Sequence, residues 1–355
     1  MSTFLLYGAN GYTGRLIARE AVVRGLRPVL AGRNAEAVGA LARELGLEHR
    51  IFSLDRRDAG PTAAGPTVNL EGVQAVLHCA GPFAHTAKPM VDACLEARVH
   101  YLDITGEISV FESLAARDTE AMAAGILLLP GAGFDVVPSD CLAAHLHRRL
   151  PAAKRLTLAF QGIGRYSRGT ATTIVENLHH GGAVRRSGVL TSVPAAWRTR
   201  DIDFGKGPTL AVTIPWGDVS TAYRSTGIGD IEVYTAMSRW QLRLMRLSRP
   251  FGWALRTSRV QNFLKRRIQA GPPGPNDEER ARGRTYLWGE VEDGQGRRMV
   301  SRLRGPEGYT FTMQTALAAL TRVLNGDAPA GYQTPSLAYG PDFVLDVPGV
   351  ERVDE

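Results

Sequence analysis

The residues best suited to chemistry are three glycines near the start of the chain. The stretch LLYGANGYTGRLIARE places Gly8, Gly11 and Gly14 between an apolar run and an amphipathic one. Glycines at such a strand-to-helix turn allow a tight turn, a close approach of the backbone to a pyrophosphate, and packing of the helix on the strand. Backbone N–H groups at the helix start then face the phosphates. The turn predicts a dinucleotide site, with a plain tight turn as the alternative.

The residues after the second predicted strand indicate which dinucleotide binds. The run RPVLAGR continues into Gly32-Arg33-Asn34, without the acid that usually grips the ribose 2′-hydroxyl of NAD. The planar, charged fork of an arginine suits a 2′-phosphate instead. We therefore predict NADP as the cofactor, with a solvated loop cation as the alternative role of Arg33. The expected cofactor-binding residues are Gly8, Asn10, Gly11, Tyr12, Thr13, Gly14, Arg33, Asn34, Asp55, Cys79, Ala80 and Gly81.

Polar residues at the ends of later strands are the candidates for catalysis. They are Tyr101, Asp103 and Glu107 in HYLDITGE, and Asp135 in GAGFD. A carboxylate at a strand end could orient the nicotinamide ring or relay a proton. The alternative is that Asp103 and Asp135 cap helices or hold loops by hydrogen bonds. For Cys79 we expect a backbone contact to NADP rather than nucleophilic catalysis, which would need a thiol of lowered pKa.

Apolar strand-like runs alternate with helical patterns over the first 150 residues. Strands are expected in FLLY, RPVLAGR, HRIFSLD, VQAVLHCAG, HYLDITGE and ILLLPGAGFD, and helices over residues 35–45 and 109–124. This alternation predicts an α/β fold with a Rossmann-type, doubly wound parallel sheet, whose ligands collect at the carboxyl ends of the strands. Residues 209–235 are predicted as strands with turns at Gly217 and Gly227, and GQG as a hairpin turn.

Several other chemistries lack their residues. None of the ten tyrosines has a lysine four positions later, which argues against the proton relay of short-chain dehydrogenases. His179 and His180 are adjacent and no pair of ligands has metal spacing, so no metal is predicted. The nucleophile elbow Gly-x-Ser-x-Gly is also missing, which excludes the usual α/β-hydrolase arrangement.

Composition and charge define the setting of this chemistry. The chain has 355 residues, 44% of them hydrophobic, and only three cysteines, so we expect a cytoplasmic protein without disulfides. The net charge is +7, and between Arg239 and Pro275 nine basic residues occur without any acidic one. Apolar residues lie among these cations, and Pro250 should divide the stretch into two helices. The pattern is typical of an interfacial helix, with a core or dimer-interface helix pair as the alternative.

The blocks GANGYTG, HCAGPF, HYLDITGE and PGAGFDVVPSD occur together in one order that resembles the saccharopine dehydrogenase-like oxidoreductases, a group that includes bacterial trans-acting enoyl reductases. IPWGDVSTAYRSTGIGDIEVY, GPEGYTFT and TPSLAYGPDFVLDVPGVE are similar to it as well. The resemblance implies an NADP-binding Rossmann domain, a second α+β domain and a C-terminal helix returning to the first. We place these in residues 1–150, 151–305 and 306–355.

Three functions remain compatible with the sequence. The first is an NADP-dependent reductase of a C=C, C=O or C=N bond in a large, apolar, lipid-like or polyketide-like substrate, carried on an acidic carrier protein or coenzyme A. The second is an amino-acid dehydrogenase acting on saccharopine-like secondary amines, which the basic stretch disfavours. The third is a non-catalytic, membrane-associated NADP-binding protein. Expected partners are a small-molecule, apolar substrate bound to a carrier protein or coenzyme A, an anionic membrane surface and a second copy of the chain, and no nucleic acid.

Overall fold

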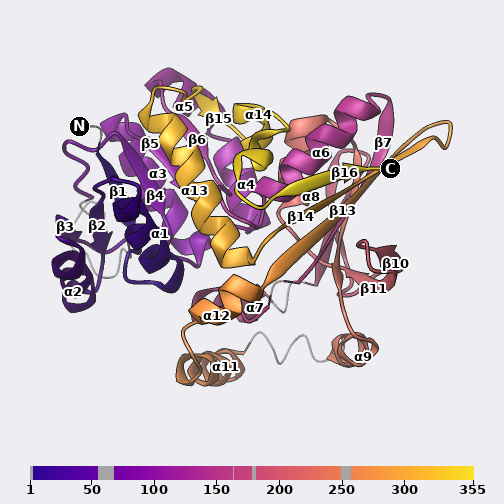
Figure 1. Ribbon diagram of the computed structural model, residues 1–355, viewed down its shortest axis with the longest axis horizontal. Coiled ribbons are helices and arrows are strands. Elements are labelled where there is room, and N and C mark those ends of the chain that lie inside the picture. Colours follow the sequence, from indigo (N-terminus) through magenta and orange to yellow (C-terminus); the bar gives the residue numbers. More distant parts are fainter. Residues whose placement is uncertain (1–2, 55–67, 163, 178–180, 249–256) are drawn as a thin grey trace. The chain divides into compact units, whose positions relative to one another are not determined.

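The computed structural model describes residues 3–54, 68–162, 164–177, 181–248 and 257–355 (Figure 1). The chain divides into two compact units. The first unit comprises Met1–Phe134 and Thr312–Ala338, and the second comprises Asp135–Phe311 and Tyr339–Glu355. Each unit is built around a sheet of its own.

The first unit contains a seven-stranded sheet in the order β15-β6-β5-β4-β1-β2-β3. All neighbouring strands in this order pair in parallel. The order reverses between β1 and β4, which is the switch point where doubly wound sheets bind ligands. The predicted Rossmann-type sheet is confirmed. The strands are β1 Phe4–Tyr7, β2 Val29–Gly32, β3 His49–Ile51, β4 Ala75–His78, β5 His100–Asp103, β6 Leu127–Leu129 and β15 Gly331–Tyr332.

The helices of the first unit connect these parallel strands. They are α1 Tyr12–Val23, α2 Ala35–Leu45, α3 Phe83–Ala97, α4 Ile108–Ala115 and α5 Asp118–Ala124, together with most of α13 Gly308–Leu324 and α14 Pro335–Tyr339. The helix predicted over residues 35–45 is confirmed as α2. The single helix predicted over residues 109–124 is wrong, because the chain breaks between α4 and α5. There Arg117 turns its guanidinium to Asp92 at 2.6 Å and Glu120 at 2.8 Å.

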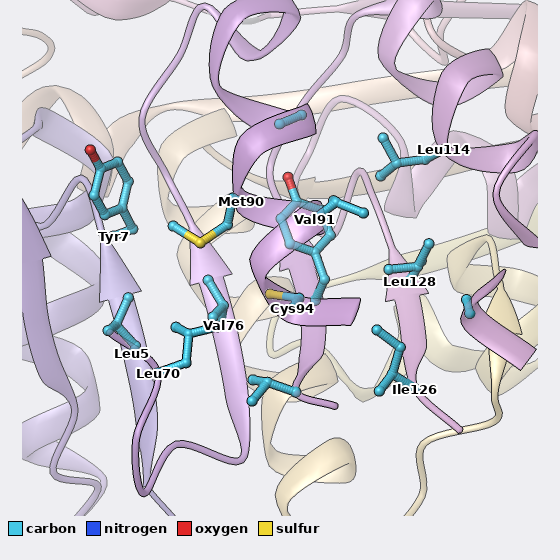
Figure 2. Packing of buried hydrophobic residues seen from close by; sticks show 14 of the residues in the cluster. Leu5, Tyr7, Leu70, Val76, Met90, Val91, Cys94, Leu114, Ile126 and Leu128 are labelled. Atoms are coloured by element: carbon cyan, nitrogen blue, oxygen red, sulfur yellow. The ribbon is translucent and has the colours of Figure 1, made fainter. Parts of the chain in front are cut away.

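The core of the first unit lies between its sheet and the helices that cover it. Figure 2 shows Leu5 of β1, Val76 of β4 and Leu128 of β6 on the same side of the sheet as Met90 and Val91 of α3. All five side chains are buried. Strands β1, β2 and β4 are buried along their whole length, as expected for a parallel sheet that is covered on both faces.

The second unit contains a mixed sheet in the order β10-β11-β12-β7-β13-β14-β16, with β8 and β9 attached beside β12. The β12–β7 pair is parallel, and the other strand pairs among the described residues are antiparallel. The hairpin predicted around GQG is confirmed as β13 and β14. The strands are β7 Ala153–Gln161, β8 Gly182–Arg186, β9 Val189–Val193, β10 Thr199–Asp203, β11 Pro208–Thr213, β12 Asp230–Ala236, β13 Arg284–Asp293, β14 Arg298–Pro306 and β16 Glu351–Asp354.

The helices give the second unit its α+β character, as predicted. They are α6 Val137–Arg149, α7 Arg168–Asn177, α8 Asp218–Thr226, α9 Arg239–Ser248, α11 Ser258–Ala270, α12 Asp277–Arg282 and the 3₁₀ helix η4 Phe343–Asp346. The expectation of strands throughout residues 209–235 is wrong in its middle, where α8 separates β11 from β12. Buried Val219 and Ala222 share one face of that helix, and Gly227 ends it in the left-handed conformation with φ 70°.

Two expected domain boundaries differ from the structure. Residues 135–150 were placed in the first domain, but they form α6 in the second unit. Residues 306–355 were expected to return to the first domain together, whereas only Thr312–Ala338 does. The final strand β16 pairs with β14 of the second unit, because its backbone completes the edge of that sheet.

Two helical glycines of the first unit differ in the space around them. A Cβ atom at Gly14 would lie 2.3 Å from the carbonyl oxygen of Gly8, a backbone atom that cannot turn away. A Cβ atom at Gly39 would lie 3.5 Å from Arg43 and 3.6 Å from His49, which is ordinary contact.

We therefore expect Gly14→Ala to lower the free energy of unfolding by about 1–3 kcal/mol, through overpacking of backbone on backbone. Gly39→Ala should raise it by up to about 1 kcal/mol, since alanine is the better helix former. Urea denaturation of both variants and the wild type measures the two changes. Equal effects of the two substitutions would contradict the tight contact at Gly14.

Candidate functional site

The turn after β1 forms a cradle of backbone atoms at the switch point of the parallel sheet. Gly8 has a φ of 81°, in the left-handed region that favours glycine. A Cβ atom there would lie 2.8 Å from the backbone nitrogen of Ala80. The turns after β1 and β4 therefore touch through their backbones. This brings the predicted residues Gly8, Cys79 and Ala80 together.

The N-terminus of α1 is open where a phosphate would approach. Gly11 is the N-cap, and no side chain caps the helix. No acidic residue stands in the first turn, which contains the predicted residues Tyr12 and Thr13. A Cβ at Gly11 would meet only the carbonyl oxygen of Gly8, at 3.2 Å. The three glycines thus have different roles. Gly8 allows the tight turn, Gly11 leaves space for a phosphate, and Gly14 lets α1 pack closely against the turn.

The end of β2 lies beside this cradle. The Oδ1 atom of Asn10 would be 3.2 Å from a Cβ built on Gly32, so the first turn reaches the second strand. Arg33 follows directly and is exposed, as a contact to a 2′-phosphate requires. Asn34 uses its Oδ1 to cap α2 by accepting a hydrogen bond from Ala37 N at 2.9 Å. Its local role is thus to start the helix after the cofactor loop.

The turn after β4 carries three predicted contacts, Cys79, Ala80 and Gly81. Burial, with the nearby charge of Asp103, raises the pKa of the Cys79 thiol far above its usual value. The residue is therefore a neutral thiol, which agrees with the expected backbone contact and not with a nucleophile. Asp55, predicted to lie near the adenine, is outside the residues that the structure describes.

Three buried polar side chains form a chain of hydrogen bonds across the ends of β4 and β5. Tyr101 donates its hydroxyl to Asp103 Oδ2 at 2.8 Å, and His78 Nδ1 lies 3.2 Å from the same hydroxyl oxygen. Burial lowers the pKa of His78 to about 3, so its ring is neutral. Because the tyrosine proton goes to Asp103, His78 donates from Nδ1.

Asp103 fastens two loops with its other carboxylate oxygen. Oδ1 accepts hydrogen bonds from Thr105 N at 2.9 Å and Gly131 N at 2.8 Å. Burial raises the pKa of Asp103 to about 6 against the opposing effect of these bonds, and the charge of Glu107 adds to the rise. Tyr101 and Asp103 are both fully buried. Their arrangement suits positioning of the strand ends rather than contact with a substrate.

Glu107 has a defined structural contact. Its carboxylate accepts hydrogen bonds from Phe83 N at 2.7 Å and Ala84 N at 2.9 Å, the first two residues of α3. It thereby caps a helix whose own N-cap, Pro82, has no side-chain acceptor. Glu107 fixes the turn containing Gly81, and thus acts beside the cofactor cradle.

Asp135 stands apart from the other catalytic candidates because it belongs to the second unit. Burial raises the pKa of its carboxyl group to about 7. Its main-chain oxygen accepts a hydrogen bond from Trp216 Nε1 at 2.8 Å. Burial also raises the pKa of Tyr166 and of Tyr309, and the charge of Asp135 adds to both shifts. A carboxyl group that titrates near neutral pH can give or take a proton.

Sequence reasoning missed three residues of these clusters. His78 ends an otherwise apolar strand, and that polar ending was the available signal. Tyr166 and Tyr309 lie far apart in the chain, and no local pattern joins them to Asp135. Tyr309 is held by Ser167 N, which donates to its hydroxyl oxygen at 2.6 Å.

Two negative findings apply to the described residues. Among them no group of three or more His, Cys, Asp or Glu side chains is arranged to hold a metal ion. None of the described helices combines the length and the apolar character that a membrane span needs.

The parallel sheet, its switch point and the glycine cradle define a dinucleotide-binding protein. Comparison with known proteins makes this specific. Residues 4–129 match the family model of the saccharopine dehydrogenase NADP-binding domain. Residues 4–129 therefore form an NADP-binding domain of the saccharopine dehydrogenase type, as the motifs predicted.

Curated relatives resemble part of the chain, and a solved structure shares its fold. The chain is 32% identical over 148 residues to a trans-acting enoyl reductase of Mycobacterium ulcerans, and 32% identical over 153 residues to one of Mycobacterium leprae. Each match covers 41% of this chain and only 35% of the relative's length. An apo saccharopine dehydrogenase (L-Glu forming) from Saccharomyces cerevisiae shares the fold over 100% of both chains, with a TM-score of 0.64 and 12% identity.

The exposed Arg33 generates a prediction about cofactor choice. We expect NADPH to bind more tightly than NADH, and Arg33→Ala to weaken NADPH tenfold to a hundredfold. The reason is that one charge-assisted contact contributes on the order of 1.5–3 kcal/mol. Calorimetric titration of the wild type and the variant with both nucleotides tests this. Equal affinities of the wild type for NADH and NADPH would contradict it.

The raised pKa of Asp103 generates a prediction about stability. Because the folded pKa exceeds the unfolded value of 3.8, ionisation costs stability as the pH rises from about 4 to about 6. Asp103→Asn cannot ionise and escapes this loss. Between pH 4 and pH 7 the wild type should therefore lose about 2 kcal/mol relative to the variant. Denaturant titrations of both at the two pH values measure this difference. A constant difference would show that the three hydrogen bonds fully offset the effect of burial on the pKa of Asp103.

Proposed function

We propose that this protein is an NADPH-dependent reductase of a C=C, C=O or C=N bond in a large apolar substrate. The observation that carries the proposal is the backbone cradle of Gly8, Gly11 and Gly14 inside the region that matches an NADP-binding domain. NADPH supplies a hydride when bound. Reduction of a double bond then needs one proton, which a residue of the chain or water must deliver.

Asp135 is our candidate for the proton donor. Its carboxyl group is half protonated near pH 7, where a general acid is most effective. Tyr101, Asp103 and Glu107 then act as positioning residues. The bonds to Gly131 N and to the first two residues of α3 hold the loops that border the cradle. This division separates residues that touch the reacting atoms from those that hold the loops.

Among the three kinds of bond we favour an enoyl C=C bond. The support is the similarity of part of the chain to curated relatives that are trans-acting enoyl reductases. The alternative is a saccharopine-like secondary amine, supported by the fold shared with the yeast enzyme. The two substrate classes differ in charge at the reacting part. A saccharopine-like amine carries several carboxylates, whereas the acyl chain of a thioester is uncharged.

A substrate panel separates these functions. Purified protein is mixed with NADPH and with enoyl thioesters of rising chain length, a ketone and an imine, and with NADP and secondary-amine dicarboxylates. We expect NADPH oxidation with a long-chain enoyl thioester. Turnover of the dicarboxylates alone would favour the amino-acid dehydrogenase. Tight NADPH binding without turnover of any compound would favour the non-catalytic alternative.

Gly11→Val is the matched negative control for this panel. The valine side chain would occupy the position where the pyrophosphate approaches. Within the protein, a Cβ at residue 11 would contact only one backbone atom, the Gly8 carbonyl oxygen, so the variant should still fold. We expect loss of NADPH binding and of all turnover with a thermal melt close to that of the wild type. Unchanged binding in a folded variant would show that the turn is merely structural.

The role of Asp135 is tested with the substrate that the panel identifies. Asp135→Asn should lower kcat about 10²–10⁴-fold, because an amide cannot donate the proton. NADPH affinity should stay the same. In the wild type, activity should fall as the pH rises above about 7, and the variant should lack this fall. An unchanged rate in the variant would assign the proton to another group.

A further inference from the structure

Two helices of the second unit expose large apolar side chains. Trp240, Leu244 and Leu247 of α9 are 63%, 53% and 67% exposed, and Phe263 of α11 is 61% exposed. These side chains are thus exposed to solvent instead of being packed in the core of the unit. Exposed apolar groups that gather in this way mark an interaction surface.

Helix α9 has two apolar faces, and only one packs within its unit. Leu242 is 8% exposed and, with Met245, joins a cluster that includes Val212. Trp240, Leu244 and Leu247 follow each other at spacings of four and three residues, which places them on one face. At 100° per residue, that face lies opposite Leu242 and Met245. The packing of α9 on its unit therefore turns the second apolar face outward.

Arginines line the exposed apolar face of α9. Arg239, Arg243 and Arg246 have the same spacing as the three apolar residues, shifted by one position. They form a stripe about 100° around the helix from the apolar ridge. All three are exposed. Their long aliphatic stems can lie along the apolar face while the guanidinium groups stay in contact with polar groups.

Helix α11 repeats this combination on its outward side. On its inner side Lys265 Nζ forms an ion pair with Glu176 of α7 at 2.5 Å, and Gln261 Nε2 donates to Val175 O at 3.0 Å. These contacts fix which side of α11 faces the unit. Phe263 then points outward, and the exposed residues Arg259, Arg266 and Arg267 surround its face.

The six arginines share one further property. None of them forms an ion pair with any residue that the structure describes, whereas Lys265 beside them does. The sequence from Arg239 to Pro275 also contains no acidic residue. The charged residues on the exposed faces of α9 and α11 are thus all positive. The same faces on a second copy of the chain would be repelled by them. An anionic partner with a deformable apolar phase satisfies both the arginines and the projecting rings.

We propose that the exposed faces of α9 and α11 dock this protein on an anionic lipid bilayer. Trp240, Leu244, Leu247 and Phe263 insert at the level of the headgroups, and the arginines contact the lipid phosphates. Projecting side chains of this size suit a fluid acyl phase better than the fixed surface of an acidic protein. The inference goes beyond the reductase activity, which stands or falls by the substrate panel.

The test measures co-sedimentation of the full chain with vesicles of phosphatidylserine and phosphatidylcholine, and with phosphatidylcholine alone. We expect binding to the anionic vesicles at low salt that weakens strongly at about 0.5 M salt. The variant Arg243→Glu/Arg246→Glu/Arg266→Glu should bind at least about 100-fold more weakly, since each cation contributes about fivefold. The control Arg43→Glu/Lys154→Glu/Arg224→Glu changes net charge equally on exposed cations elsewhere. It should bind like the wild type.

The apolar part of the proposal has its own readouts. Trp240→Ala/Phe263→Ala should lower binding about tenfold, and Val23→Ala/Val189→Ala, two exposed residues elsewhere, should not. The emission of Trp240, obtained by subtracting the spectrum of Trp240→Phe, should shift to the blue with anionic vesicles. NADPH affinity should be equal in all variants, which shows that they are folded.

Three results would overturn the proposal. One is a wild type that ignores anionic vesicles at low salt. Another is equal loss of binding in the charge variant and its control. The third is a wild-type dimer in sedimentation velocity that the charge variant converts to monomer, which would make the patch an interface between copies. In each case the reductase proposal keeps its own test.

Discussion

The close approach of backbone to backbone around Gly8 is the constraint on which the first unit depends. A single Cβ at Gly8 would meet Ala80, and one at Gly14 would meet Gly8 itself. The turn after β1, the start of α1 and the turn after β4 therefore fit together only without side chains. This contact sets the opening of the sheet at its switch point, and the space at Gly11 becomes the place where a pyrophosphate can lie.

A second layer of constraint lies behind this cradle. The buried chain of His78, Tyr101 and Asp103 crosses from β4 to β5, and Asp103 also holds the loop at Gly131. A buried polar group without a hydrogen-bond partner would destabilise the fold by more than a formed hydrogen bond stabilises it. This network therefore specifies the geometry of the strand ends. Glu107 extends the arrangement to the start of α3. Polar residues that would suit catalysis by type are thus used to position the cofactor loops.

The arginines on the surface of the second unit fall into two groups, those with a carboxylate nearby and those without one. Many arginines of the second unit have a carboxylate nearby, for example Arg186 and Arg198 on Glu232. The exposed arginines of α9 and α11 do not, among the residues described. Among the described residues, the exposed arginines of α9 and α11 are therefore a group of cations whose charge an outside anion can balance.

The sequence by itself determined the elements whose cause is local. Glycine spacing, short buried strands and helical periodicity predicted the parallel sheet, α2 and the NADP cradle, since each depends on neighbouring residues. The motifs also indicated the type of NADP-binding domain that residues 4–129 match. The replacement of an acid by Arg33 could be recognised because its position follows directly from the second strand.

Only the tertiary structure decided which residues meet across long stretches of chain. It showed that α8 interrupts the expected strands, that β16 completes the second sheet, and that His78 joins Tyr101. It also showed that Glu107 caps a helix. It placed Asp135 close enough to Tyr309, which lies far along the sequence, for the charge of the carboxylate to raise the pKa of the tyrosine. Sequence patterns record local periodicity, whereas these contacts arise from packing between distant segments, and burial of a carboxyl group sets its pKa only once that packing exists.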